Sequence, residues 1–391
     1  MLMNLFIPGI LAVLFSFLNY HPIPGFKSKA EKLAQNFIVL DSHIDLPDRI
    51  LGRTNNMSIW TEGQFDYEKA SSGGLNVAFM SIYVSSSKNG HDAYNHANDL
   101  IDLVEKICRS YPYEFAHAYD VADVRTQFHS DRISLPMGME NGSPLNGDLN
   151  NLEHFYNRGI RYITLSHFKS NDICDSSTDP EQPHNGLSEF GEKVVRRMNE
   201  LGIMIDVSHV SDATIEHVLE LSYAPVIASH SSCKNFTPEF SRNISNDLIE
   251  RIAEKEGIIM VNFGNMFQNH EASTNFNKMR QGLDEKQLEP GTVEGDEFME
   301  QFRKEYPIEA DIKEVANHID HIVELVGIDH VGFGSDFDGI GSFVPKGLED
   351  VSKYPNLIDE LLKRDYSNED IKKICGENFL RVWKAVEEVA H

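Results

Sequence analysis

The stretch Phe37-Ile-Val-Leu-Asp-Ser-His-Ile-Asp45 decides the fold of this chain. Its first four residues form a continuous apolar run, which is typical of a β-strand buried on both faces. His43 and Asp45 follow two residues apart, so they point to the same side where the strand ends. An imidazole and a carboxylate presented together form half a site for a divalent metal such as zinc. Alone this pair is a weak signal, and the rest of the chain decides its meaning.

The same arrangement recurs along the chain, because seven further short apolar runs have the pattern of buried strands. Helical stretches with apolar periodicity, such as residues 90–109, 187–201 and 310–326, separate many of these runs. Strands that alternate with helices in this way predict an α/β fold, a single (β/α)8 barrel of the TIM type with extra C-terminal helices. The predicted strands cover residues 37–40, 75–84, 134–139, 160–165, 203–207, 225–228, 258–263 and 330–334.

Polar residues suited to metal or acid–base chemistry follow six of the eight predicted strands. Active sites of such barrels lie at the carboxyl ends of the strands, so we expect these side chains to meet at one rim. A packed core does not suit so many polar groups, because each one left buried and unpaired costs about 1–3 kcal/mol. Metal ligation removes that cost. The residues are His43 and Asp45, Glu140, His167, His209, His230 and Asp336.

Five of these side chains exceed the need of one catalytic zinc ion: His43, Asp45, Glu140, His209 and His230. They fit two zinc ions that share a bridging carboxylate, and Glu140 arrives from a strand between the two groups. Two metals about 3.5–4 Å apart hold a hydroxide between them and polarise a carbonyl. In this hypothesis Asp336 is the acid/base and His167 steadies the developing oxyanion.

Other residues of metal-binding type are interpreted as structural. His318 and His321 have the i,i+3 spacing of a metal pair, but they fall on a helix outside the barrel. The four cysteines form no CxxC pair, which argues against a zinc ribbon or a redox motif.

The net charge and the N-terminal sequence limit which partners and which cellular location we expect. The chain of 391 residues has a formal net charge of −26, which repels phosphate backbones, so we expect no nucleic-acid partner. Residues 1–20 are uncharged and mostly apolar, which is typical of a signal peptide or a membrane anchor. We therefore expect residues 1–25 to be an export segment with a linker, and residues 26–391 to be one catalytic domain. This predicts a periplasmic, extracellular or membrane-anchored protein rather than a cytoplasmic one, and leaves the oligomeric state open, a homodimer included.

Six stretches of the chain resemble, in the same order, the membrane dipeptidase (renal dipeptidase) family of zinc peptidases. Each of them lies at a predicted strand end. They are Asp41-Ser-His-Ile-Asp45, Gly138-Met-Glu-Asn-Gly142, Thr164-Leu-Ser-His167, Ile205-Asp-Val-Ser-His-Val-Ser211, Pro225-Val-Ile-Ala-Ser-His-Ser-Ser232 and Gly332-Phe-Gly-Ser-Asp-Phe-Asp-Gly339.

The resemblance implies that His43 and Asp45 bind one zinc ion, that His209 and His230 bind the other, and that Glu140 bridges them. It also implies an enzyme that hydrolyses small dipeptides and tolerates a D-residue at their C-terminal position.

The resemblance assigns substrate-binding roles as well. It implies that His167 contacts the tetrahedral centre of the substrate and that Asp336 handles the proton of the attacking water. It further implies that Arg242 grips the terminal carboxylate of the dipeptide, a task that suits a forked guanidinium. Gly264 stands where relatives can carry a tyrosine.

Two alternatives stay open at this point. One is a metal-dependent lactamase or deaminase on the same barrel, although such enzymes often bridge their metals with a carboxylated lysine and no predicted strand here ends in lysine. The other is a catalytically silent binding protein of this fold, which the loss of a ligand would favour, and none is missing. Serine-hydrolase (Gly-x-Ser-x-Gly) and His-Glu-x-x-His motifs are absent from the sequence. Residues 267–308, polar and without clear periodicity, are expected to be a lid or a partly helical insertion.

Overall fold

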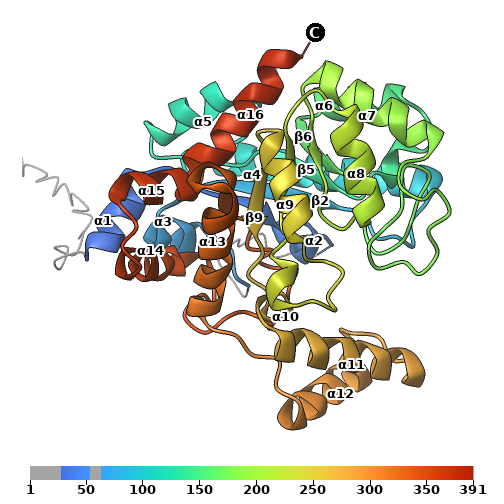
Figure 1. Cartoon of the computed structure of the whole chain (residues 1–391). Coiled ribbons are helices and arrows are strands. Elements are labelled where there is room, and N and C mark those ends of the chain that lie inside the picture. Colours follow the sequence, from blue (N-terminus) through green and yellow to red (C-terminus); the bar gives the residue numbers. More distant parts are fainter. Residues whose placement is uncertain (1–27, 53–62, 391) are drawn as a thin grey trace, which may run out of the picture.

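Eight parallel strands close into a ring, because β1 pairs with β2 on one side and with β10 on the other. This computed structural model describes residues 28–52 and 63–390 (Figure 1). The predicted export segment, residues 1–25, lies outside the described residues. The (β/α)8 barrel predicted from the sequence is therefore confirmed. Its strands are β1 (Val39–Ile44), β2 (Leu75–Tyr83), β5 (Met137–Glu140), β6 (Ile160–Thr164), β7 (Met204–Asp206), β8 (Val226–Ala228), β9 (Ile258–Val261) and β10 (Val331–Phe333).

The third predicted strand, residues 134–139, is in fact two strands. The first part is β4 (Ile133–Ser134), which pairs with β2 and with the two-residue strand β3 (Phe115–Ala116). The second part is β5, which begins at Met137 and pairs with β2 and β6. Pro136 separates the two, because proline has no N–H to donate to a ladder. Its carbonyl still accepts a hydrogen bond from the N–H of Met80, at 2.8 Å.

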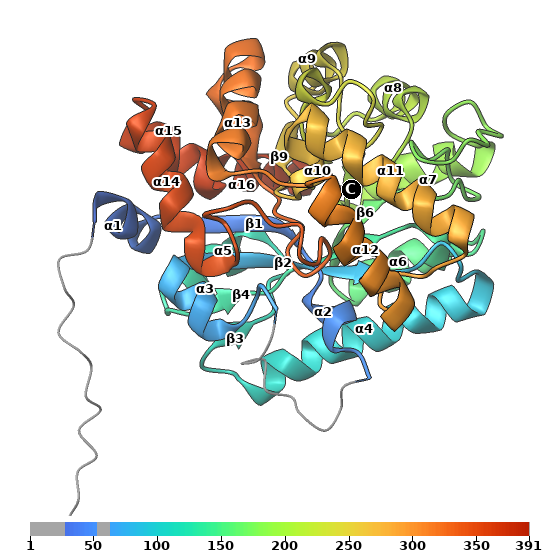
Figure 2. The same cartoon turned by 90° about the horizontal axis from the view of Figure 1, so that it is seen from below.

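Helices cover the outside of the ring (Figures 1 and 2). The helical stretches predicted at residues 90–109, 187–201 and 310–326 are confirmed as α4, α7 and α13, with ends that differ by at most two residues. Ser188, Ser211 and Ser245 cap α7, α8 and α9, and Gly202 ends α7 with a φ of 77°. The helices are α1 (Lys29–Asn36), α2 (Leu46–Ile50), α3 (Tyr67–Gly73), α4 (Gly90–Ser110), α5 (Val121–Phe128), α6 (Asn150–Asn157), α7 (Glu189–Leu201), α8 (Asp212–Leu221), α9 (Asn246–Glu254), α10 (Asn265–Gln268), α11 (His270–Lys286), α12 (Val293–Glu305), α13 (Ile312–Val326), α14 (Tyr354–Lys363), α15 (Asn368–Lys372) and α16 (Asn378–Val389).

Apolar side chains seal the amino end of the barrel. The ring of Phe79, from inside the barrel, lies 5.2 Å from that of Phe379 and 5.1 Å from that of Trp383, measured between centroids. Phe379 and Trp383 belong to α16, and all three side chains are fully buried. Since this end is filled with apolar groups, a polar site has room only at the opposite, carboxyl end.

The segment 267–308 forms a helical hairpin, so a helical insertion, one of its two predicted forms, is confirmed. Its helices α11 and α12 extend below the barrel in Figure 1 and lie in front of it when the molecule is seen from below in Figure 2. The hairpin has an apolar cluster of its own, which includes Met279 and Ile308 and, partly buried, Phe276, Phe298 and Phe302. A lid role for it stays a prediction.

Two further features of the described residues concern the helices and the cysteines. Within residues 28–52 and 63–390, no helix combines the length and the apolar character needed to cross a membrane. All four cysteines are free thiols, and Cys174, Cys233 and Cys375 are buried.

Candidate metal centre

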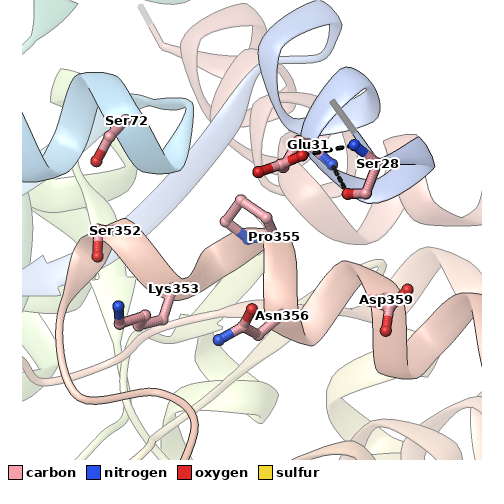
Figure 3. A pocket seen from close by; sticks show the side chains of 8 residues that line it. All are labelled: Ser28, Glu31, Ser72, Ser352, Lys353, Pro355, Asn356 and Asp359. Carbon is pink, nitrogen blue, oxygen red and sulfur yellow. Dashed lines mark hydrogen bonds between the residues drawn. The ribbon is translucent and has the colours of Figure 1, made fainter. Parts of the chain in front are cut away.

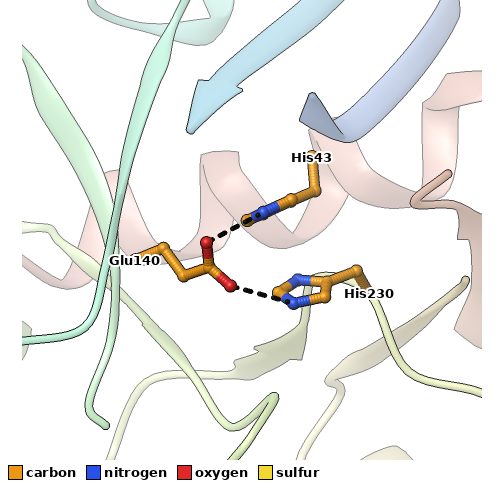
Figure 4. A group of neighbouring side chains, drawn as sticks. All are labelled: His43, Glu140 and His230. Atoms are coloured by element: carbon orange, nitrogen blue, oxygen red, sulfur yellow. Dashed lines mark ion pairs between the residues drawn. The ribbon is translucent and has the colours of Figure 1, made fainter. Parts of the chain in front are cut away.

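Glu140, the last residue of β5, lies among four histidines at the carboxyl end of the barrel. Its Oε2 is 3.5 Å from Nε2 of His43. Its Oε1 is 3.0 Å from Nε2 of His209 and 3.4 Å from Nε2 of both His230 and His167. Figure 4 shows the carboxylate between His43 and His230, with one oxygen turned to each ring. One carboxylate thus spans two separate groups of imidazoles.

The nitrogen atoms around Glu140 fit a metal better than they fit one another. Nε2 of His43 is buried and has no hydrogen-bond partner among the described residues, although Oδ2 of Asp45 lies 3.5 Å away. Nε2 of His209 and Nε2 of His230 are only 2.9 Å apart, and one proton between them satisfies both only as a donor–acceptor pair. Buried imidazole and carboxylate groups without enough partners are the donor set that zinc ions take. The residues present therefore fit a metal centre.

Asp336 joins the same rim from the other end of the chain. One ligand atom each from His43, Asp45 and Asp336 lie within 4.8 Å of one another. The N–H of Asp336 donates to the carbonyl of His43 at 3.1 Å, and that of Asp45 donates to the carbonyl of Phe337 at 2.9 Å. Gly339 makes this approach feasible, since a Cβ there would collide with the carboxylates of Asp45 and Asp336.

The buried carboxylates are perturbed in different directions. Burial raises the pKa of Asp336 to about 6, with the charge of Glu140 adding to the rise and His43 opposing it. Burial likewise raises the pKa of Asp45 well above its usual range. Burial also acts on Glu140, but His167, His43 and the contacts with the other two histidines outweigh it and hold its pKa well below the usual range. Crowded acids of this kind favour a bound cation.

The imidazoles at the rim are mainly kept neutral. Burial lowers the pKa of His167 to about 4, and it lowers the pKa of His209 and His230 well below the usual range. His43 differs: burial opposes its protonation, but Asp45 and Glu140 raise its pKa to about 10. A neutral imidazole keeps the lone pair that ligates a metal, so three of the four rings are ready donors.

Two site residues have a backbone conformation that is rare outside glycine. His209 has a φ of 70° and Asp336 a φ of 64°, in the turns that follow β7 and β10. Such left-handed residues cost about 1–3 kcal/mol each and persist where the surrounding structure holds them. The turns place both side chains over the rim of the barrel.

A chain of buried hydrogen bonds supports His230. Its Nδ1 lies 2.7 Å from Oγ of Ser229, and that hydroxyl lies 2.6 Å from Oδ2 of Asp206. Asp206 also accepts the N–H groups of Ser208 and Ser229, at 3.0 and 2.8 Å. A ligand histidine tied down through its second nitrogen has a defined orientation.

Two further contacts were missed by the sequence analysis. Asn262 donates from Nδ2 to Oδ2 of Asp336 at 2.8 Å. Because Asn262 directly follows β9, the strand-end rule that found the other site residues also applies to it. Tyr162 lies inside β6, with its hydroxyl 2.8 Å from Nδ1 of His43. A tyrosine in the middle of a buried strand gives no signal in the sequence.

Arg242 lies at the same rim, next to His230. It is 6% exposed, donates to the carbonyl of His230 at 3.3 Å, and lies over the ring of Phe267 with Cζ 5.4 Å from the centroid. Burial lowers its pKa to about 10, so it is still a cation at neutral pH. All of the sequence-predicted site residues are thus brought to one end of the barrel.

The histidine pair His318 and His321 belongs to no metal group in the described part of the chain. His318 is fully buried on α13, where Nδ1 accepts the N–H of Cys233 at 3.0 Å and Nε2 lies 3.1 Å from the carbonyl of Gln268. His321 contacts Oδ1 of Asn246 at 2.8 Å. Both rings thus have protein hydrogen-bond partners, on a helix outside the barrel as the sequence predicts.

A polar pocket in the outer helical layer shares no residue with this site (Figure 3). Its residues come from α1, α3, α14 and the turn before α14, and none belongs to a strand. It is lined by Ser28, Glu31, Ser72, Ser352, Lys353, Pro355, Asn356 and Asp359.

Comparisons with known proteins agree with the site. A model of the membrane dipeptidase family, peptidase family M19, matches residues 27–391. The chain is 34% identical to dipeptidase tcpJ of Claviceps purpurea over 336 residues, which are 84% of this chain and 70% of that relative.

Two solved structures extend the likeness to three dimensions. The probable dipeptidase PvdM from Pseudomonas aeruginosa has a TM-score of 0.82 and 30% identity, with 92% of this chain and 98% of that chain covered. A metallo peptidase from Rhodobacter sphaeroides, solved with a phosphinate mimic of the dipeptide L-Ala-D-Ala, has a TM-score of 0.76 and 25% identity, with 90% and 99% covered.

Proposed function

Since this chain belongs to the membrane dipeptidase family, peptidase family M19, and is therefore a metal-dependent dipeptidase, we propose that it uses two zinc ions to hydrolyse the peptide bond of small dipeptides. One observation carries the proposal: the two oxygens of Glu140 face His43 on one side and His209 with His230 on the other. A carboxylate that bridges two metals needs this arrangement.

Five residues would hold the metals. His43 and Asp45 would bind one ion, His209 and His230 the other, and Glu140 both. When bound, two zinc ions supply Lewis-acid polarisation of the scissile carbonyl and a water acidic enough to attack at neutral pH. The donor set of imidazoles and carboxylates is of the kind that zinc takes in catalytic sites.

Asp336 is proposed to move the proton. With a pKa of about 6, its carboxylate is largely ionised at neutral pH, so it accepts a proton from the attacking water. The same carboxyl then returns the proton to the nitrogen of the leaving amino acid, and the peptide bond breaks. Asn262, which donates to Oδ2, keeps the carboxyl oriented during both transfers.

His167 and Arg242 are proposed to hold the substrate. His167 is a neutral ring with a buried Nδ1 that has no hydrogen-bond partner among the described residues, so it has capacity to contact the developing oxyanion. Arg242 offers a buried guanidinium beside His230, where a forked pair of N–H donors suits the terminal carboxylate of a dipeptide.

Tolerance of a D-residue at the C-terminal position is part of the proposal. It is supported by the Rhodobacter metallo peptidase, which was solved with a mimic of L-Ala-D-Ala. The test is a panel of L,L and L,D dipeptides given to the purified full chain, with metal content measured alongside. We expect hydrolysis of both series, two zinc ions per chain, and loss of activity with a chelator that added zinc reverses. One metal per chain would contradict the bridged pair, and a chain that hydrolyses only β-lactams would support the lactamase alternative.

We also propose that residues 1–25 direct the protein out of the cytoplasm, because residues 1–20 are uncharged and mostly apolar. Cell fractionation with N-terminal sequencing of the recovered protein tests this and separates cleavage from anchoring. Recovery of the intact chain from the cytosol would contradict it. Light scattering of the same material determines the oligomeric state, which the sequence leaves open and for which a homodimer is one possibility.

A further inference from the structure

An exposed aromatic ring borders the metal centre. Phe168 follows His167 directly and is 39% exposed. Its ring centroid lies 4.0 Å from that of His167 and 5.6 Å from that of His209. An exposed phenyl ring is costly in water, and the proposed chemistry assigns no task to this one. The ring therefore lies beside residues proposed to hold the substrate and a metal.

The helical hairpin supplies a cation to the same ring. Arg280, an exposed residue of α11, has Cζ 5.0 Å from the centroid of Phe168. Across residues 28–52 and 63–390, no ion pair or side-chain hydrogen bond of Arg280 is recorded.

The position of Arg280 is set by packing rather than by a free loop. Helix α10 carries Phe267, whose ring lies under Arg242 and 5.0 Å from that of Phe240. Helix α11 follows directly and is held by Phe276, 5.6 Å from the ring of Phe343. The guanidinium groups of Arg242 and Arg280 therefore both lie at the carboxyl-end rim of the barrel, each over an aromatic ring.

We propose that Arg280 and Phe168 form a subsite for an anionic side chain, so that dipeptides containing glutamate or aspartate are preferred substrates. This rests on the proposed dipeptidase function. Arg242 is occupied by the terminal carboxylate in that function, which leaves the second guanidinium for a second carboxylate. The phenyl ring contacts the methylene groups of such a side chain, while the guanidinium pairs with its end.

The net charge of the chain also favours a cationic subsite for anionic substrates. A chain with 61 acidic and 35 basic residues repels anionic substrates unless cations are placed where they bind. An apolar side chain of the substrate, packed against Phe168, would cover the guanidinium of Arg280 without pairing its charge. Covering an unpaired charge is unfavourable. A carboxylate satisfies both groups at once.

The test compares isosteric substrates. The two pairs are Glu-Ala with Gln-Ala and Ala-Glu with Ala-Gln. In at least one pair, wild type should have the higher kcat/KM for the peptide that contains glutamate. Arg280→Gln should lower that glutamate-to-glutamine ratio roughly tenfold, as expected for loss of a charge-assisted hydrogen bond. Higher ionic strength should lower the ratio in wild type and leave it nearly constant in the variant.

Lys278→Gln is the matched control, because it removes the same charge from the same helix. Its Nζ lies 5.8 Å from the ring centroid of Tyr306 rather than over Phe168, so the ratio should stay as in wild type. Phe168→Leu keeps the charge and removes the ring that both side chains contact through their methylene groups, so it should lower kcat/KM for the glutamate and glutamine members alike. Equal rates for glutamate and glutamine peptides in wild type, or an equal loss of both in Arg280→Gln, would overturn the subsite and leave the dipeptidase function standing. A chain that hydrolyses no dipeptide would overturn both.

Discussion

The hydroxyl of Tyr162 lies 2.8 Å from Nδ1 of His43, deep in the barrel. The same hydroxyl donates its only proton to the carbonyl of Ser42, at 3.0 Å. It must therefore accept the hydrogen bond from Nδ1–H of His43. In the neutral form of His43, which binding of a metal requires, the lone pair is therefore on Nε2, the nitrogen that faces Glu140. In many metal-binding histidines a carboxylate or a carbonyl accepts the hydrogen bond from the second ring nitrogen. Here the acceptor is a tyrosine hydroxyl.

Tyr162→Phe should weaken metal binding. The substitution removes the acceptor for Nδ1–H and keeps the ring, so we expect an affinity loss of about 10–100-fold, as for other partners of metal ligands. Competition with a chromophoric chelator measures it. Tyr366→Phe is the control, because its hydroxyl bonds Asp320 at 2.9 Å in the outer layer. Equal metal affinity in both variants would show that Tyr162 does not select the tautomer.

Glu140→Gln should abolish turnover and reduce bound zinc. The amide keeps the size of the side chain but supplies only one oxygen ligand, so it cannot bridge the two proposed metal ions. The measurement is dipeptide hydrolysis with zinc per chain determined on the same sample, and His209→Ala should behave alike. Glu153→Gln, which alters an exposed ion pair with Arg197, is the control. Near-normal rates in Glu140→Gln would refute the ligand assignment.

Asp336→Asn should keep the metal and lose rate. The amide accepts no proton, so we expect kcat to fall by about 10²–10⁴-fold, the usual contribution of a general acid/base. The substrate KM should change little, since the shape of the side chain is kept. A loss of zinc together with the rate would instead make Asp336 a ligand, which its place within 4.8 Å of His43 and Asp45 permits.

His318→Gln should change how stability depends on pH. Burial lowers the pKa of His318 from 6.5 to about 4. Between these values the unfolded chain binds a proton that the folded chain does not, so protonation favours unfolding as the pH falls. From about pH 7.5 to about pH 5.5, wild type should lose about 1 kcal/mol more unfolding free energy than the variant. Denaturant titrations at both pH values measure the difference, and parallel losses would contradict it.

The barrel and the proposed metal ligands could be predicted because both depend on local signals. A strand buried on both faces is a short apolar run, and the polar residues just after it lie at the mouth of the barrel. His167, His209 and His230 each come two residues after the end of such a run, with a serine between. No long-range information is needed to place them at one rim once the fold is known.

Tyr162 and Arg280 could not be predicted, because their roles depend on contacts between distant segments. Tyr162 has the sequence pattern of a core residue. Its hydrogen bond with His43 becomes visible only when the structure places its hydroxyl next to β1. Arg280 lies on a helix whose polar sequence has weak periodicity. Its partner helix α12 has only Gly295 buried, since the hairpin packs on itself rather than on the main core. The amphipathic signal that predicts most helices is therefore faint there.

The pairing of β1 with β10, which closes the barrel, also determines when the site is assembled during synthesis. β1 leaves the ribosome early, but its neighbour β10 and the hydrogen bond from Asp336 to His43 come from the last part of the chain. A nascent polypeptide that ends before Asp336 has no completed ring and cannot hold the final arrangement of donors. We therefore expect a metal ion to be taken up only after the segment that carries Asp336 has been synthesised and has joined β1.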